Sequence, residues 1–490
     1  MLMLNQQELE NKLAVLEAET QLMEPQGQDL EDLTKKIVDY GHQYLNNVDS
    51  INAYSSEASE AKLLQNAPFA EDGRNLDDLI NIIKTDVDKP GINPASGGHL
   101  GYIPGGGIYP TAMGDYLAAV VNKYAGVFYA SPGAVQLENM VLRWMIELIG
   151  FPKISLGNLT SGGSIANLIA IVTARDAKGI TSEKIKKSCI YLTKQAHHSV
   201  HKAIRIAGLA EAHLQEIDVD ERFKMDVHKL KTQIDSDIKN GLLPFLVIAS
   251  AGTTDIGAID PLDEIADIAS TSNLWFHVDA AYGGFFMLVD NLKAKFKGIE
   301  KADSLTIDPH KGLFLAYGLG AVIIKDVEAL RNSHYYQANY MQDVTEVLEE
   351  PSPADLSPEL TKHFRGLRMW LPLQLFGVSV FRKALEEKIL LCQYFYQKIQ
   401  ELGFDVGPDP ELSVCIYRFA DGIDDKNKFN AELIKAVQND GRIYISSTTI
   451  DGVFWLRLAV LVFRTHKKTI DELLYILEKK RNSLQPCTQN

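Results

Sequence analysis

A lysine that follows a short apolar run is the residue of this chain best suited to act as a nucleophile. Residues 305–307 predict a buried strand, and the Asp-Pro-His turn after it presents Lys311 at the strand's exit. An amine held beside apolar walls loses solvation of its charged form, so the neutral, nucleophilic amine becomes accessible. Such an amine can form an imine. A surface lysine after an ordinary turn has the same local pattern. Whether Lys311 is a nucleophile or a surface residue therefore depends on the other residues that accompany it.

A glycine-rich segment offers a site for an anion. Residues 157–167 read Gly-Asn-Leu-Thr-Ser-Gly-Gly-Ser-Ile-Ala-Asn and lead into a predicted helix. Backbone N–H groups, the hydroxyl of Ser164 and the helix dipole could together bind one phosphate. The segment lacks the Gly-Lys-Ser/Thr ending of a nucleotide P-loop. It also lacks the Gly-x-Gly-x-x-Gly pattern of a dinucleotide site. An ordinary helix N-cap has a similar composition, so the motif is ambiguous alone.

An aspartate ends another predicted strand. Asp279 follows the apolar residues 275–278 and precedes small residues. A carboxylate in such a place costs free energy unless it has a cationic partner. A protonated ring nitrogen would be such a partner, and Ala281 could lie flat beneath the ring. A helix N-cap is the structural alternative.

Two more strand ends carry polar groups. His197 follows the predicted strand 189–193 and could stack on a flat ring or exchange a proton. Its neighbour His198 invites a metal interpretation, but no nearby carboxylate or cysteine supplies further ligands, so we predict no metal. Thr254, after strand 245–250, adds a hydroxyl at the same edge of the sheet. With Lys311, these groups predict a pyridoxal-phosphate site in which the aspartate keeps the ring nitrogen protonated.

Residues 150–325 predict the elements that position these groups. Strands that are apolar throughout alternate with helices, which predicts an α/β fold with a mostly parallel central sheet flanked by helices. Ligands of such sheets bind at the carboxyl ends of the strands. Residues 6–48 predict two amphipathic helices, which could contact a partner subunit or the rest of the chain. We expect an N-terminal helical arm (1–95), a large α/β domain (96–365) and a small C-terminal α+β domain (366–490).

Composition narrows the class of protein. The 490 residues carry a formal net charge of −15, which disfavours nucleic acid or an anionic membrane as the main partner. The four cysteines have neither metal-ligand spacing nor the density of a disulfide framework. No segment reads as a signal peptide or a membrane span. A cytoplasmic protein without a membrane partner is expected.

Five motifs, in this order, resemble those of the group II pyridoxal-phosphate-dependent amino-acid decarboxylases, which include the aromatic-amino-acid, histidine and glutamate decarboxylases. The matching runs are Thr-Ser-Gly-Gly-Ser, Gln-Ala-His, Gly-Thr-Thr, His-Val-Asp-Ala-Ala-Tyr-Gly and Asp-Pro-His-Lys. The resemblance implies pyridoxal-phosphate fold type I and decarboxylation of an L-amino acid to an amine and CO2, through a Schiff base on Lys311. It also implies a homodimer with the active site at the subunit interface. Another reaction on this scaffold, by a carbon–carbon lyase or an aminotransferase, and a non-catalytic binding protein are the alternatives.

The resemblance also assigns roles by position. Phosphate contacts fall on Gly163, Ser164 and His310, ring stacking on His197, the ring-nitrogen contact on Asp279, a further cofactor contact on Thr254, and the Schiff base on Lys311. Family members carry a loop tyrosine that protonates the α-carbon, and Tyr340 lies at the matching interval, with Tyr335 and Tyr336 as rivals. A tyrosine there favours simple decarboxylation over the oxidative, aldehyde-forming branch.

Two positions depart from the family. A loop near residue 103, with Tyr102, Ile103 and Gly105 as candidate substrate contacts, reads Ile-Pro-Gly-Gly-Gly where some aromatic-amino-acid decarboxylases have phenylalanine and then threonine. This implies a smaller, more open pocket, and the sequence does not name the substrate. Asp308 stands where several relatives have asparagine. Because an acidic group is unfavourable near a phosphate, we expect Asp308 to act through its backbone or as a turn residue.

Overall fold

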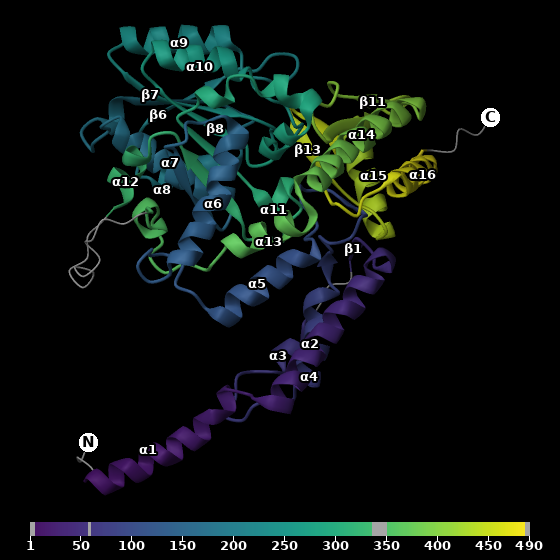
Figure 1. Cartoon of the computed structure of the whole chain (residues 1–490). Coiled ribbons are helices and arrows are strands. Elements are labelled where there is room, and N and C mark those ends of the chain that lie inside the picture. Colours follow the sequence, from purple (N-terminus) through teal and green to yellow (C-terminus); the bar gives the residue numbers. More distant parts are fainter. Residues whose placement is uncertain (1–4, 57–59, 336–349, 486–490) are drawn as a thin grey trace. The chain divides into compact units, whose positions relative to one another are not determined.

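The computed structural model describes residues 5–56, 60–335 and 350–485, which fall into two compact units, Met1–Asn93 and Pro94–Asn490 (Figure 1). The first unit is mainly helical. Its elements are α1 (Gln6–Thr20), α2 (Gly27–Asn47), α3 (Lys62–Gln65), α4 (Leu76–Ile82) and the antiparallel pair β1 (Tyr54–Ser55) and β2 (Gly91–Ile92). Asn5 and Glu8 form a reciprocal capping box at the start of α1. The two helices predicted over residues 6–48 are confirmed.

The second unit contains a seven-stranded sheet, counted over the described residues. Its order is β4 (Leu156–Thr160), β10 (Gly320–Ile324), β9 (Ser304–Ile307), β8 (Trp275–Asp279), β7 (Leu243–Ser250), β5 (Ser188–Thr193) and β6 (His213–Ile217). Strand β10 runs antiparallel to both neighbours, and the other pairings are parallel. The predicted α/β fold with a mostly parallel sheet is confirmed.

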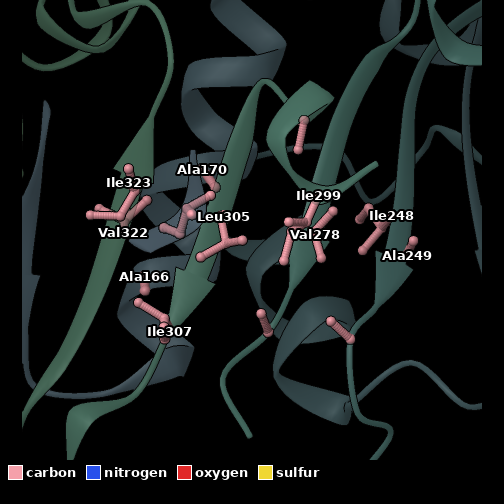
Figure 2. Close-up of a cluster of buried hydrophobic side chains, with 14 of the residues drawn as sticks. Ala166, Ala170, Ile248, Ala249, Val278, Ile299, Leu305, Ile307, Val322 and Ile323 are labelled. Atoms are coloured by element: carbon pink, nitrogen blue, oxygen red, sulfur yellow. The ribbon is translucent and has the colours of Figure 1, made fainter. Parts of the chain in front are cut away.

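Apolar side chains on both faces explain why these strands lie in the interior. The residues of β8, β9 and β10 are all buried. Figure 2 shows Leu305 of β9 beside Ala170 of α7 (Gly163–Ala177), a helix whose small residues let it lie close to the sheet. Other helices in this stretch of chain are α6 (Pro132–Ile149), α8 (His198–Ile206), α9 (Val227–Lys239), α10 (Leu262–Thr271), α11 (Pro309–Gly312) and α12 (Val327–His334).

Two strands of the sheet were not predicted. β4 carries a glycine and an asparagine, and we took these residues only as the start of an anion-binding loop. The glycine is needed there, because a Cβ built on Gly157 would lie 1.8 Å from the carbonyl oxygen of Val322 in β10. β6 is an edge strand with mostly exposed side chains, so it lacks the apolar run of a buried strand.

A smaller five-stranded sheet lies nearer the C-terminus of the described residues. Its order is β11 (Phe404–Val406), β12 (Val414–Phe419), β14 (Val453–Ala459), β13 (Tyr444–Ile450) and β3 (His99–Leu100), with helices α13 (Gly366–Phe376), α14 (Val378–Glu401), α15 (Lys426–Asp440) and α16 (Lys467–Leu484) in the same stretch of chain. The sequence of residues 370–401 reads as one continuous helical stretch. The structure has two helices there, because Gly377 adopts a φ of 72° between α13 and α14.

Three cysteines in the described part of the chain, Cys189, Cys392 and Cys415, are buried free thiols. Cys487 lies outside the described residues. Among the helices of residues 5–56, 60–335 and 350–485, none is both long and apolar enough to cross a membrane.

Two buried histidines make stability depend on pH. Burial lowers the pKa of His99 and of His277 to about 4. The unfolded chain, with a histidine pKa near 6.5, therefore binds protons first as the pH falls, and stability present above pH 6.5 is lost toward pH 4. We expect each histidine to remove about 2 kcal/mol of stability between pH 7.5 and 5.

Urea denaturation at these two pH values measures the effect. In His99→Phe, whose ring would lie among the rings of Tyr102 and Tyr444, the pH-dependent loss should shrink by about 2 kcal/mol. The exposed His228→Asn should keep the wild-type pH dependence. An unchanged pH dependence in His99→Phe would contradict the assignment.

Candidate active site

A cavity of about 400 Å³ lies at the carboxyl ends of the central strands. Residues that follow β4, β5, β7, β8 and β9 line it, as expected for ligand sites of parallel sheets. The cavity brings together eight residues that the sequence singled out: Gly163, Ser164, His197, Thr254, Asp279, Ala281, His310 and Lys311. The candidate substrate residues Tyr102, Ile103 and Gly105 are not among its lining residues.

One end of the cavity is formed by the first turn of α7. The first N–H groups of a helix have no intrahelical partner and attract anions. A Cβ built on Gly162 would lie 3.4 Å from Cε1 of His310, and one on Gly163 would lie 3.0 Å from Oδ2 of Asp308. We call Gly162, Gly163, Ser164, Asp308 and His310 the anion cradle.

His310 has a defined tautomer in the cradle. Its Nδ1 lies 2.6 Å from the carbonyl oxygen of Leu319, so Nδ1 carries the proton and donates it. Burial is the main cause that lowers the pKa of His310. The ring therefore favours its neutral form, in which Nε2 carries no proton. Nε2 lies 3.7 Å from Oδ2 of Asp308.

Lys311 faces a carboxylate that the sequence analysis had not assigned to it. Its Nζ lies 3.3 Å from Oδ2 of Asp308, whose side chain is only 2% exposed. Asp308 does support the turn, since its carbonyl accepts hydrogen bonds from the N–H groups of Lys311 and Gly312. Its side chain, however, lines the cavity, which we had not predicted. Only the folded structure shows this, because a turn aspartate usually points to solvent.

Asp279 is held at the end of β8 by two donors. Its Oδ2 accepts a 2.9 Å hydrogen bond from Nδ2 of Asn167, and its Oδ1 accepts a 3.1 Å bond from the N–H of Ala281. Both residues are buried. The carboxylate is thus kept away from water and oriented by neutral donors, which leaves it able to bind a cationic ring nitrogen.

A hydrogen-bond network behind Asp279 fixes the direction of Asn167. The amide oxygen of Asn167 accepts hydrogen bonds from Thr306 Oγ1 (2.7 Å) and His277 Nε2 (3.0 Å). His277 Nδ1 in turn lies 2.8 Å from Ser304 Oγ. Because the amide oxygen is engaged by these donors, its NH2 group points at Asp279. Asn167 was part of the predicted glycine-rich motif, but its role as the support of Asp279 was missed.

Replacing Asn167 by alanine should therefore cost stability as well as activity. The change leaves buried polar atoms of Thr306, His277 and Asp279 without partners, at about 1–3 kcal/mol for each group. We expect a loss of at least about 2 kcal/mol in urea denaturation, whereas Asn427→Ala, whose bonds lie at the surface, should cost less than about 1 kcal/mol. Equal costs for the two variants would contradict the network.

His197 is the N-cap residue of α8 and lines the cavity. Its Nδ1 accepts from the N–H of Ser199 and lies 2.7 Å from that residue's hydroxyl. Burial is the largest influence on its pKa and lowers it, while the charge of Asp279 opposes the shift. The neutral imidazole is the form suited to stack on a flat ring.

The loop of the candidate substrate residues lies directly against the turn of Lys311. A Cβ built on Gly105 would be 2.5 Å from the carbonyl oxygen of His310 and 2.9 Å from that of Lys311. Arg457 of β14, also missed by the sequence analysis, donates hydrogen bonds to the carbonyls of Gly101 and Thr254. The loop thus contacts the turn of Lys311 directly and is linked to Thr254 through Arg457.

Gly105→Ala should displace the Lys311 turn, because the atoms that its Cβ would meet are backbone and cannot rotate away. We expect a destabilisation of about 1–3 kcal/mol. A shift of about 1 Å at the reacting group would lower kcat by up to about 10²-fold. Gly133→Ala is the matched control, since its Cβ would meet nothing within 4 Å. Steady-state kinetics and thermal unfolding of both variants test this, and wild-type kcat in Gly105→Ala would contradict it.

The predicted loop tyrosine cannot be placed. Tyr340 and its rival Tyr336 lie outside the described residues. The other rival, Tyr335, directly follows α12 and is 43% exposed. The guanidinium of Arg331 lies over its ring. Tyr335 is not among the residues that line the cavity.

The residues of the cavity fit pyridoxal phosphate. The anion cradle would hold the phosphate, Asp279 the ring nitrogen, and Lys311 the aldehyde carbon. Glycines at positions 162 and 163, where a Cβ would lie 3.4 Å from Cε1 of His310 and 3.0 Å from Oδ2 of Asp308, keep the start of α7 open to a phosphate.

Comparisons with known proteins agree with this chemistry. Residues 60–419 match the family described as the pyridoxal-dependent decarboxylase conserved domain. The aromatic-L-amino-acid decarboxylase of Bacillus atrophaeus is 32% identical over 435 residues, which cover 86% of this chain and 89% of that protein. Tryptophan decarboxylase 2 of Oryza sativa subsp. japonica is 26% identical over 464 residues, which cover 90% and 92%.

A solved structure shows the same fold. Oryza sativa TDC with pyridoxal phosphate and tryptamine superimposes with a TM-score of 0.89 at 22% identity, over 94% of this chain and 99% of that chain. Five motifs in one cavity, the family match over most of the chain and this shared fold lead to one conclusion. The chain belongs to the group II pyridoxal-phosphate-dependent amino-acid decarboxylases.

Proposed function

We propose that this decarboxylase acts on an L-amino acid with a neutral, aromatic side chain and releases the corresponding amine and CO2. The observation that carries the choice of substrate class is the charge of the cavity wall. Among the described residues that line the cavity, Lys311 is the only lysine or arginine. An acidic substrate side chain would thus meet no guanidinium there, whereas a neutral one needs none. The names of the relatives from Bacillus atrophaeus and Oryza sativa point to the same class.

Each residue of the site has a role in this proposal. When bound, pyridoxal phosphate supplies an electron sink for the electron pair that remains after CO2 leaves. Asp279 would keep a proton on the ring nitrogen, and Asn167 holds that carboxylate in place. His197 would stack on the cofactor ring, and Lys311 would hold the cofactor between turnovers. Reprotonation of the α-carbon by Tyr340 stays a prediction.

A panel of L-amino acids tests the substrate class. The holoenzyme is incubated with Trp, Tyr, Phe, dihydroxyphenylalanine, His, Glu and Asp, while trapped CO2 and the amine product are measured. We expect CO2 and an amine from at least one aromatic member. Turnover of only Glu or Asp would contradict the substrate class, and a keto acid without CO2 would indicate an aminotransferase instead.

We also propose that the protein is a homodimer with its active site at the subunit interface. Every described residue of α1 is exposed, including Leu9, Leu13 and Leu16, and an apolar helix face of this kind is usually covered by a partner. Sedimentation should give twice the mass of the chain. The double variant Leu13→Glu, Leu16→Glu should shift the enzyme toward a monomer, whereas the equally exposed Leu390→Glu of α14 should not.

A cytoplasmic location is part of the proposal. Its support is chemical: the three described cysteines are free thiols, the state that a reducing compartment maintains.

A further inference from the structure

Two side chains of the anion cradle are hydrogen-bond acceptors without protons. A phosphate group, which carries about −1.5 to −2 charges near pH 7, is also an acceptor. Such a group needs donors around it, and the first turn of α7 supplies them. On the opposite side of the cradle, however, lie the carboxylate of Asp308 and the bare Nε2 of His310.

Asp308 has no room to turn away. Its side chain is 2% exposed, and Oδ1 has no hydrogen-bond partner among the described residues. A Cβ built on Gly320 of β10 would lie 2.5 Å from Oδ1, and one built on Gly163 of α7 would lie 3.0 Å from Oδ2. The residues of β10 and α7 that lie against the carboxylate are therefore glycines, and a larger residue at either position would contact it.

The charged neighbours of Asp308 are few. Lys311 lies 3.3 Å away and is its cationic partner. Nε2 of His310 lies 3.7 Å from Oδ2 of Asp308. The charge of Asp308 also acts on His197, the N-cap residue of α8, where it raises the pKa against the effect of burial. Burial keeps both rings mainly neutral. Among the described residues, Lys311 is therefore the one strong cationic partner of Asp308, and it is also the amine assigned to the cofactor.

We infer that Asp308 takes up one proton from solvent when the phosphate of pyridoxal phosphate enters the cradle. The proton adds to a carboxylate oxygen, neutralises it and turns an acceptor into a donor; the imine of Lys311, which forms with release of water, is a separate step that pyridoxal would share. An asparagine would provide a donor without this proton. The inference rests on the assignment of the cradle to the cofactor's phosphate. It makes cofactor capture weaker as the pH rises, because the required proton becomes scarcer.

Calorimetric titration of the apoprotein with pyridoxal phosphate tests the inference. Measurements at pH 8 in two buffers of different ionisation enthalpy give the number of protons taken up. Wild type should take up about one proton more than Asp308→Asn. Between pH 7 and 9 the Kd of wild type should rise about tenfold more per pH unit than that of Asp308→Asn. The half-buried Asp355→Asn, outside the cavity, should behave as wild type.

Pyridoxal, which lacks the phosphate, is the matched control ligand. In wild type the additional proton should be absent with pyridoxal, a comparison that needs no variant to fold. The same proton count for both ligands, or for wild type and Asp308→Asn, would overturn the inference. Loss of the proton in His310→Asn while Asp308→Asn keeps it would place the proton on the histidine and overturn it as well. No binding of pyridoxal phosphate by wild type would instead overturn the cofactor assignment itself, and the inference with it.

Discussion

Lys311→Ala is expected to lower decarboxylase activity by at least about 10³-fold and to remove the visible absorbance of the lysine-bound cofactor. Lys311 alone, among the described residues that line the cavity, carries an aliphatic amine. A loss of this size follows because no neighbouring side chain can replace that amine. Absorbance spectra and CO2 release from the purified protein measure the two effects.

A second variant separates the amine's chemistry from its charge. Lys311→Arg keeps a cation beside Asp308, but a guanidinium stays protonated and does not act as the nucleophile. It should therefore retain the stability of the wild type and lose activity like Lys311→Ala. Lys301→Ala, which removes a surface ion pair with Asp263, should leave activity unchanged. Retained absorbance and activity in Lys311→Ala would exclude this lysine as the cofactor-bearing residue.

Asp279→Asn should lower kcat by about 10²- to 10⁴-fold while the cofactor remains attached to Lys311. The neutral amide cannot hold a proton on the ring nitrogen, so the electron sink weakens. The amide offers one acceptor oxygen where the carboxylate offers two, so its NH2 group would face either the NH2 group of Asn167 or the N–H of Ala281. Visible absorbance near that of wild type together with a large loss of kcat distinguishes this variant from Lys311→Ala.

Asp303→Asn is the matched control for the ring-nitrogen aspartate. Asp303 is also a shielded carboxylate of the same sheet, and its Oδ2 accepts a hydrogen bond from the N–H of Phe276. It precedes β9, at the amino ends of the parallel strands, whereas the cavity lies at their carboxyl ends. We expect near-wild-type kcat for Asp303→Asn. If Asp279→Asn were equally active, the carboxylate would have no part in the electronic role assigned to it.

The fold was predictable from sequence where burial is complete. β5, β7, β8 and β9 are mostly apolar, and each prediction fell within two residues of the observed strand. β4 and β6, the two edge strands, were missed because β4 carries polar and small residues and the side chains of β6 are mostly exposed. Gly377 divides α13 from α14, and a single glycine does not reveal its positive φ in the sequence.

The residues that carry the chemistry were predictable because each follows a strand. His197, Asp279 and Lys311 come together simply because parallel strands end at one edge of a sheet. The residues that hold them in place were not predictable. Asn167 and Arg457 act on groups more than a hundred positions away, so their partners depend on tertiary packing.

The pairing of β4 with β10 sets the order in which the protein can assemble during synthesis. β4 leaves the ribosome early, but its hydrogen-bonding partner is made only when residues 320–324 emerge. Such distant pairing is slow, since a long loop must close before any contact forms. The turn of Asp308 and Lys311 emerges just before β10. The start of α7, which follows β4 and forms the phosphate end of the pocket, is therefore joined to the other strands of the sheet only after β10 has been made.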